Sequence, residues 1–174
     1  MTYGNRFRCD PDHTLRAQYS FTDHSVNPYL GQEGAAVQDL GVRILVVEDY
    51  ATWSRFICST LEQKQELKVV CVASNGLDAI EKAGQLKPDL ILLDIGLPEL
   101  NGIEAARRIR AFAPQSKIIF VSENRDRDVI HEALSTGASG YVLKALAARE
   151  LLSAVEVVLR GGTFVSDHLA PSGN

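Results

Sequence analysis

The sequence predicts a doubly wound α/β domain, with a five-stranded parallel sheet of order 2-1-3-4-5 and five helices on its two faces. Two observations support this prediction. Short apolar runs alternate five times with segments whose apolar residues recur every three or four positions. The runs, most clearly residues 90–93, lack polar alternation, as expected for strands buried on both faces of a parallel sheet. The 174 residues allow one such domain and a small appendage.

Each strand is predicted from an apolar run and each helix from an amphipathic period. The expected strands cover residues 44–47, 69–72, 90–93, 118–121 and 139–143. The expected helices cover residues 50–65, 76–86, 102–112, 125–136 and 147–160. Apolar side chains at helical spacing should face the sheet, among them Trp53, Phe56, Ile57, Leu61, Leu77, Ile80, Val129, Ile130, Leu134, Leu151, Leu152, Val155 and Leu159.

Local signals place several helix ends. Asn101 can cap the third helix, with Glu104 three residues further on, as in a capping box. Gly137 is placed to end the fourth helix, and Gly161 with Gly162 should stop the fifth.

The ends of the chain differ from the predicted domain, which we assign to residues 43–160. Residues 1–42 are polar and rich in turn-forming residues, without an apolar run, and we interpret them as an N-terminal extension, a tail or linker. Their two histidines, His13 and His24, are too few for a metal site. Residues 161–174 are interpreted as a C-terminal linker remnant.

Composition excludes several classes of protein. The net charge of −4 gives no general electrostatic case for nucleic-acid binding. No apolar run approaches the ~20 residues of a membrane span, and the N-terminus lacks an apolar signal core. The three cysteines, Cys9, Cys58 and Cys71, have no metal-type spacing. We therefore expect a cytoplasmic protein that does not contact a membrane.

Polar residues stand at the ends of four predicted strands. Glu48 and Asp49 follow the first strand, Asp94 the third, Ser122 the fourth and Lys144 the fifth. The carboxyl ends of parallel strands share one edge, and the order 2-1-3-4-5 has its switch point between strands one and three. These side chains should therefore converge. Each one alone has an ordinary explanation as a helix-start, loop or surface residue, but their joint placement favours a site.

Three converging carboxylates repel one another unless a cation lies between them. Hard oxygen ligands suit Mg²⁺ in octahedral geometry. Asp49 and Asp94 are the expected direct ligands, Glu48 would act through a water, and a backbone carbonyl at Gly96 would complete the protein's share.

The remaining polar groups suggest phosphoryl transfer. Lys144 adds a positive charge and Ser122 a hydroxyl group to the same edge. In an aspartyl-phosphate site, Asp94 would attack a phosphoryl group while Mg²⁺ and Lys144 neutralise its oxygens.

Residues 42–162 resemble the receiver domain of two-component response regulators, which has a CheY-like, flavodoxin-like fold. The form of the segment from Gly137 to Lys144, and of residues 161–166, resembles the NarL/FixJ subfamily, whose receivers precede a LuxR-type helix-turn-helix. The motifs that carry the family resemblance are Arg43-Ile44-Leu45-Val46-Val47-Glu48-Asp49, Asp89-Leu90-Ile91-Leu92-Leu93-Asp94-Ile95-Gly96-Leu97-Pro98, Asn101-Gly102-Ile103-Glu104, Ser122 and Gly137-Ala138-Ser139-Gly140-Tyr141-Val142-Leu143-Lys144.

The resemblance implies that Asp94 is the phosphoacceptor and that its donor is a sensor histidine kinase or a phosphotransfer protein. The chain would then not be an enzyme in its own right, beyond self-catalysed phosphorylation and dephosphorylation. The output surface would be formed by the fourth helix, the fifth strand and the fifth helix. The resemblance assigns Mg²⁺ to Glu48 and Asp49, phosphoryl contacts to Ser122 and Lys144, and the conformational switch to Ser122 and Tyr141.

Two departures from the family pattern motivate an alternative. Glu123 follows Ser122, where a small residue is usual, and Gly96 replaces a larger residue near Asp94. A degenerate receiver that acts as a constitutive interaction module therefore stays open. A metal-dependent phosphohydrolase is disfavoured because it usually has an acidic residue at the position of Gly96. A flavodoxin-type nucleotide binder is disfavoured because no glycine-rich phosphate loop follows the first strand.

Only 14 residues follow Arg160, whereas a helix-turn-helix needs several tens. The chain is expected to be a stand-alone receiver or the receiver part of a longer LuxR-type transcription regulator. In both cases we expect no nucleic-acid binding through this chain, and a homodimer stays open.

Overall fold

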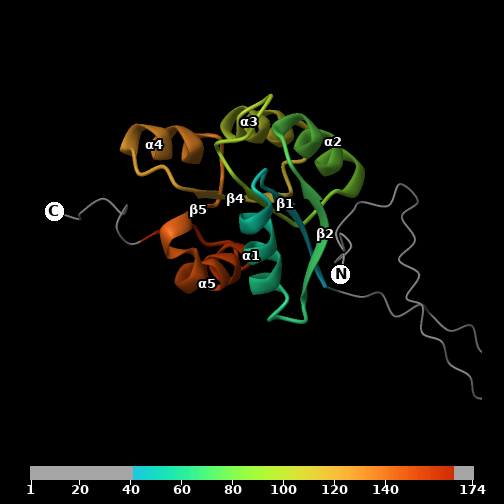
Figure 1. Ribbon diagram of the computed structural model, residues 1–174. Helices are drawn as coiled ribbons and strands as arrows, with labels where there is room; N and C mark the ends of the chain where they lie inside the picture. The colour runs from blue at the N-terminus through green and yellow to red at the C-terminus, as the bar shows by residue number, and fades with distance from the viewer. Residues whose placement is uncertain (1–40, 167–174) are drawn as a thin grey trace, which may run out of the picture. The chain divides into compact units, whose positions relative to one another are not determined.

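A computed structural model describes residues 41–166, which form a parallel sheet with helices on both faces (Figure 1). The strand order is β2-β1-β3-β4-β5-β6, and every neighbouring pair is parallel. The strands are β1 (Val42–Val47), β2 (Leu67–Ala73), β3 (Leu90–Leu93), β4 (Lys117–Ser122), β5 (Gly140–Leu143) and β6 (Phe164–Val165). The helices are α1 (Ala51–Leu61), α2 (Gly76–Leu86), α3 (Gly102–Phe112), α4 (Arg127–Ser135), the 3₁₀ turn η1 (Lys144–Leu146) and α5 (Ala147–Leu159).

Two apolar clusters fill the two sides of the sheet. In β1, Leu45 and Val47 belong to the cluster under α2, α3 and α4, whereas Ile44 and Val46 belong to the cluster under α1 and α5. Figure 1 shows the same division of the helices. All four residues of β3 are buried, as expected for a strand covered on both faces. The predicted fold class is therefore confirmed.

The structure differs from the expectations at three places. Leu77 was expected to face the sheet, but it is 48% exposed, because the buried side of α2 is formed by Gly76, Ala79 and Ala83. The first helix was expected over residues 50–65, but it ends at Leu61 because the chain turns there and the Leu67 N–H already bonds to Lys64 O, leading into β2. The sheet also has a sixth strand, β6, which was not predicted. It pairs with β5 through Gly140 and Tyr141.

The predicted helix ends are confirmed. The Asn101 side chain accepts a hydrogen bond from Glu104 N at 2.9 Å and so caps α3. The Glu104 carboxylate pairs with Arg108 at 2.9 Å rather than with the Asn101 N–H, so only the Asn101 half of the expected capping box is formed. Gly137 has φ 85° just after α4, and Gly161 has φ 90° after α5, a conformation that favours glycine.

Among the described residues, no helix combines the length and apolar character that a membrane crossing requires. His13, His24 and nearly all of the proposed N-terminal extension lie outside the described residues, as do residues 167–174.

Candidate functional site

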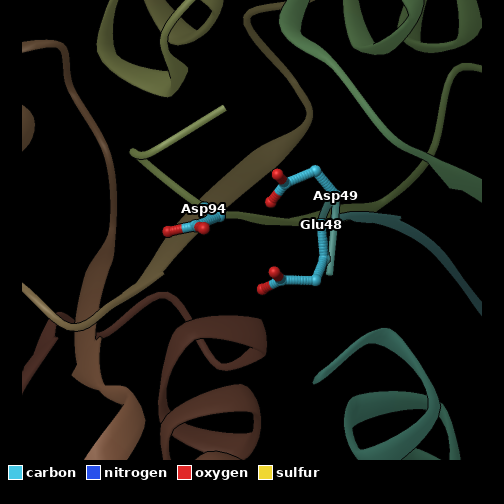
Figure 2. Close-up of side chains that lie close together, drawn as sticks. All are labelled: Glu48, Asp49 and Asp94. Carbon is cyan, nitrogen blue, oxygen red and sulfur yellow. The ribbon is translucent and has the colours of Figure 1, made fainter. Parts of the chain in front are cut away.

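The site lies at the carboxyl ends of β1 and β3, which are neighbours in the sheet. Val47 pairs with Leu93, and the Asp94 N–H donates to the Val47 carbonyl at 3.0 Å. The residues after the two strands, Glu48 and Asp94, are therefore brought together by backbone pairing. Figure 2 shows the carboxylates of Glu48 and Asp49 near that of Asp94, and one oxygen from each lies within 4.8 Å of the others.

Asp94 is held in a defined orientation. It is buried, with 7% of the residue exposed, and it follows the last residue of β3 at the carboxyl edge of the sheet. Oδ1 accepts a hydrogen bond from the Ile95 N–H at 2.7 Å, and Oδ2 accepts one from Lys144 Nζ at 2.9 Å. Each of the two carboxylate oxygens therefore has a hydrogen-bond donor, and together the two donors fix the orientation of the Asp94 side chain.

Lys144 bridges two carboxylates. Its ammonium lies 2.9 Å from Asp94 Oδ2 and 2.7 Å from Glu48 Oε2, and its side chain is 6% exposed. Burial by itself would lower the pKa of Lys144, but the hydrogen bonds with Glu48 and Asp94 outweigh it and leave the pKa above its ordinary value. The lysine is therefore charged in the resting site.

Glu48 is the most deeply buried carboxylate of the group, at 2% exposed. Burial raises the pKa of Glu48 above its usual value, and the contact with Lys144 opposes this rise. Oε1 accepts from the Tyr50 N–H at 3.2 Å. Oε2 is buried and lies 2.7 Å from the Lys144 ammonium, which is its close partner among residues 41–166. This atom has lone pairs left for a further electropositive partner.

The residues present fit a divalent cation. One oxygen from each of three carboxylates lies within 4.8 Å of the others, and the two buried carboxylates share the ammonium of Lys144. Oxygen-only donors with an exposed member, Asp49, match Mg²⁺, which keeps several of its waters. Gly96 is exposed, and a Cβ built there would meet Asp94 Oδ2 at 3.8 Å, an ordinary contact. Glycine at this position leaves that side of Asp94 open.

Ser122 and Tyr141 lie on the next two strands, at the same edge. Ser122 ends β4 and its Oγ accepts from the Asn124 N–H at 3.2 Å. Tyr141 is fully buried, and its hydroxyl donates to the Asn124 carbonyl at 2.9 Å. Burial raises the pKa of Tyr141, and a side-chain hydrogen bond with Ser122 opposes the rise. Glu123, beside Ser122, is exposed.

Sequence reasoning missed three parts of this environment. Trp53 was interpreted only as a core residue of the first helix, yet its ring centroid lies 5.4 Å from Lys144 Nζ. Its position four residues after Asp49, in the first turn after β1, was the signal available. The Asn124 carbonyl that accepts from Tyr141 leaves no sequence signal, because any residue supplies a carbonyl. The Ser166 hydroxyl, described below, was hidden in a segment interpreted as linker.

Comparisons with known proteins give a consistent result. Residues 44–156 match the family model of the response regulator receiver domain. The chain is 36% identical over 128 residues to transcriptional regulatory protein LnrK of Bacillus subtilis (strain 168), covering 74% of this chain and 58% of LnrK. It is 33% identical over 129 residues to DegU of Brevibacillus brevis, covering 74% of this chain and 55% of DegU. The chain thus spans less than two thirds of these relatives.

Solved structures agree. A LuxR-family two-component response regulator from Aurantimonas sp. SI85-9A1 superposes with a TM-score of 0.72 at 29% identity, over 75% of this chain and 93% of that one. The response regulator domain of Thermotoga maritima CheB gives a TM-score of 0.65 at 34% identity, over 69% of this chain and 97% of that one. With the fold, the acidic edge and these matches together, the chain belongs to the response regulator receiver domain family of two-component systems, and its relatives include LuxR-type regulators.

Proposed function

We propose that Asp94 is a phosphoacceptor that takes a phosphoryl group from the phosphohistidine of a sensor histidine kinase or a phosphotransfer protein. The observation that carries this proposal is the pairing of the buried Asp94 carboxylate with the Lys144 ammonium at 2.9 Å, at the carboxyl edge of the sheet. A carboxylate oxygen would form the new bond to phosphorus while the bond from phosphorus to the histidine nitrogen breaks. The imidazole would keep the electron pair of that bond.

Lys144 would stabilise the charge that develops on the transferring group. Its ammonium lies between Asp94 and Glu48, so a modest movement of the flexible lysine stem would bring it to a phosphoryl oxygen while it remains paired. Ser122, at the end of the adjacent strand, would donate its hydroxyl to another phosphoryl oxygen.

Glu48, Asp49, Asp94 and the backbone carbonyl of Gly96 would hold Mg²⁺. When bound, the ion would neutralise phosphoryl oxygens and orient the donor. The chain's own part is to keep the carboxylates together: backbone pairing of β1 and β3 fixes Glu48 and Asp94, and the Ile95 N–H orients Asp94.

Ser122 and Tyr141 would carry the signal to the output surface. Tyr141 lies inward, with its hydroxyl bonded to the loop after β4. A phosphoryl group that draws Ser122 towards Asp94 would stabilise this inward conformer by a population shift. The surface formed by α4, β5 and α5 would then change its affinity for a partner.

The LuxR-type relatives support a role in transcription regulation, as a receiver on its own or as the receiver part of a longer regulator. The degenerate alternative is disfavoured because the acidic group, the lysine and the hydroxyl are all present at the expected strand ends. Protein contacts through this chain, including a homodimer, would carry the output.

The test is labelling of the purified chain by a small phosphodonor such as acetyl phosphate. We expect Mg²⁺-dependent phosphorylation of the wild type and none of Asp94→Asn. Asp89→Asn is the matched control, since Asp89 lies at the opposite end of β3, where it accepts a hydrogen bond from the Arg43 N–H at 2.7 Å. Asp89→Asn should be labelled like the wild type.

An unlabelled wild type that is folded and binds Mg²⁺ would refute the phosphoacceptor proposal and favour the degenerate receiver. Labelling that persists in Asp94→Asn would place the acceptor elsewhere.

A further inference from the structure

Trp53 lies against the charged centre of the site. It belongs to the first turn of α1, and its ring centroid is 5.4 Å from Lys144 Nζ. The same ammonium is 2.7 Å from Glu48 and 2.9 Å from Asp94. Lys144 therefore has three attractive neighbours, two carboxylates and one indole ring.

The ring is held in place by its own packing. Trp53 is half-buried against the apolar cluster under α1 and α5. Phe56, one helical turn further on, meets it edge to face, with ring centroids 5.3 Å apart and planes at 89°. A ring fixed in this way presents a constant electrostatic environment to the lysine.

We propose that Trp53 is a positioning residue for Lys144. An indole ring attracts an ammonium through its quadrupole without carrying a charge. It therefore restricts the position of the Lys144 ammonium, and it does so without a fourth carboxylate, which would compete for a metal or repel a phosphoryl group. The inference rests on the proposed phosphoryl transfer to Asp94, because it is there that the placement of Lys144 affects the rate.

The chemistry follows from the geometry. During transfer Lys144 must leave part of its contact with one carboxylate and follow a phosphoryl oxygen. The two carboxylates alone would allow the flexible stem to settle away from the reacting group, towards Glu48. A ring beside the ammonium restricts that movement and keeps water from it, which strengthens its remaining ionic contacts.

A purely structural role for Trp53 is the competing explanation, since its ring also contributes to the core. The two roles differ in whether the effect of Trp53 passes through Lys144. A positioning effect disappears when the lysine is absent, whereas a packing effect does not.

The first experiment measures the labelling rate at Asp94 over a range of acetyl phosphate concentrations. Trp53→Leu should lower the maximal rate roughly 2- to 30-fold, the range that a lost cation–π contact supports. Trp53→Phe, which keeps a ring, should recover part of this loss. Phe164→Leu is the matched control, because Phe164 is also a half-buried aromatic side chain packed on the same cluster.

The same comparison in a Lys144→Ala background decides between the roles. We expect Trp53→Leu to have no further effect there. An equal slowing with and without Lys144, or an equal slowing by Phe164→Leu, would overturn the inference.

A second measurement does not depend on phosphorylation. Ring currents of Trp53 should shift the ε-methylene protons of Lys144 upfield in NMR spectra, with Lys144→Ala identifying the signal. The shift should vanish in Trp53→Leu and persist in Phe164→Leu. A wild type that is never labelled would refute the phosphoacceptor proposal. Separately, if the chemical shift of the Lys144 ε-methylene protons is the same in Trp53→Leu as in the wild type, the contact between Trp53 and Lys144 proposed here is wrong.

Discussion

Gly102 should tolerate no side chain, although it begins a helix. It is the first residue of α3, and its N–H donates to the Ile95 carbonyl at 3.0 Å. This contact brings α3 directly against the backbone of Asp94. A Cβ at position 102 would lie 1.9 Å from the Asp94 carbonyl oxygen and 2.9 Å from its carbonyl carbon. Gly102→Ala therefore tests how tightly α3 and the proposed phosphoacceptor are packed.

Two effects of opposite sign compete in this substitution. Replacing glycine by alanine at a compatible position stabilises a protein by about 0.4–1 kcal/mol, because the unfolded chain loses freedom. Here the distance between the new Cβ at position 102 and the Asp94 carbonyl oxygen must increase from 1.9 Å to at least 3.0 Å. The Asp94 carbonyl is part of the backbone and cannot move aside as a flexible side chain would. Overpacking of this kind costs about 1–3 kcal/mol or more. The steric cost exceeds the gain, so the free energy of unfolding should fall by about 1–2 kcal/mol.

Gly96→Ala is the matched control, since Gly96 flanks the same aspartate. Its Cβ would meet only Asp94 Oδ2, at 3.8 Å, so stability should stay level or rise by up to about 1 kcal/mol. Urea unfolding followed by circular dichroism measures both variants, with the slope of the transition as a check on two-state behaviour. A Gly102→Ala protein as stable as the wild type would refute the packing argument, and so would equal destabilisation of Gly96→Ala.

Two further predictions concern β5 and its neighbours. Ser166→Ala should lower the free energy of unfolding by about 1–3 kcal/mol, because the buried Ser166 hydroxyl donates to Glu150 Oε2 at 2.6 Å and accepts from the Leu143 N–H at 3.0 Å. The substitution removes this partner from both groups, and Glu150 keeps the contact of Oε1 with Arg149. Urea unfolding measures this free energy. The control Ser135→Ala, which removes an exposed hydroxyl, should change the free energy of unfolding little. An equal loss of stability in the two variants would contradict the prediction. Burial raises the pKa of Tyr141, so its hydroxyl should titrate above the ordinary tyrosine pKa near 10. Tyrosinate absorbance measures this titration, and Tyr141→Phe should abolish it. Above about pH 10 the folded state therefore holds a proton on Tyr141 that the unfolded state has lost. The free energy of unfolding of the wild type, relative to that of Tyr141→Phe, should then fall as pH rises above about 10. If the difference between these two free energies does not depend on pH, the Tyr141 hydroxyl is not buried as described.

The sequence predicted the arrangement of the sheet because buried parallel strands carry a strong signal. The uninterrupted apolar runs gave the strands, and their order then placed Glu48, Asp94 and Lys144 at one edge. The distances in the structure agree with that convergence: Lys144 lies within 3 Å of both carboxylates. The strand order alone was therefore enough to predict that these charged side chains cluster.

Features that depend on backbone geometry could not be predicted in this way. β6 has two residues, too few for a periodic pattern, and its pairing with Gly140 and Tyr141 follows from how the chain leaves α5. The close approach at Gly102 is likewise invisible in sequence, where a glycine after Asn101 suggests only a turn. Both features arise from three-dimensional packing between segments distant in the chain.

Charge balance connects the described contacts with the proposed chemistry. Three carboxylates gather at the edge of the sheet, and Lys144 supplies one ammonium. With all three ionised, two negative charges are in excess, which is the charge that one divalent cation neutralises. Burial already raises the pKa of Glu48, a sign that the resting site holds its negative charge at a cost. Trp53 attracts the Lys144 ammonium but carries no charge, so the excess of two negative charges that a divalent cation would neutralise is unchanged.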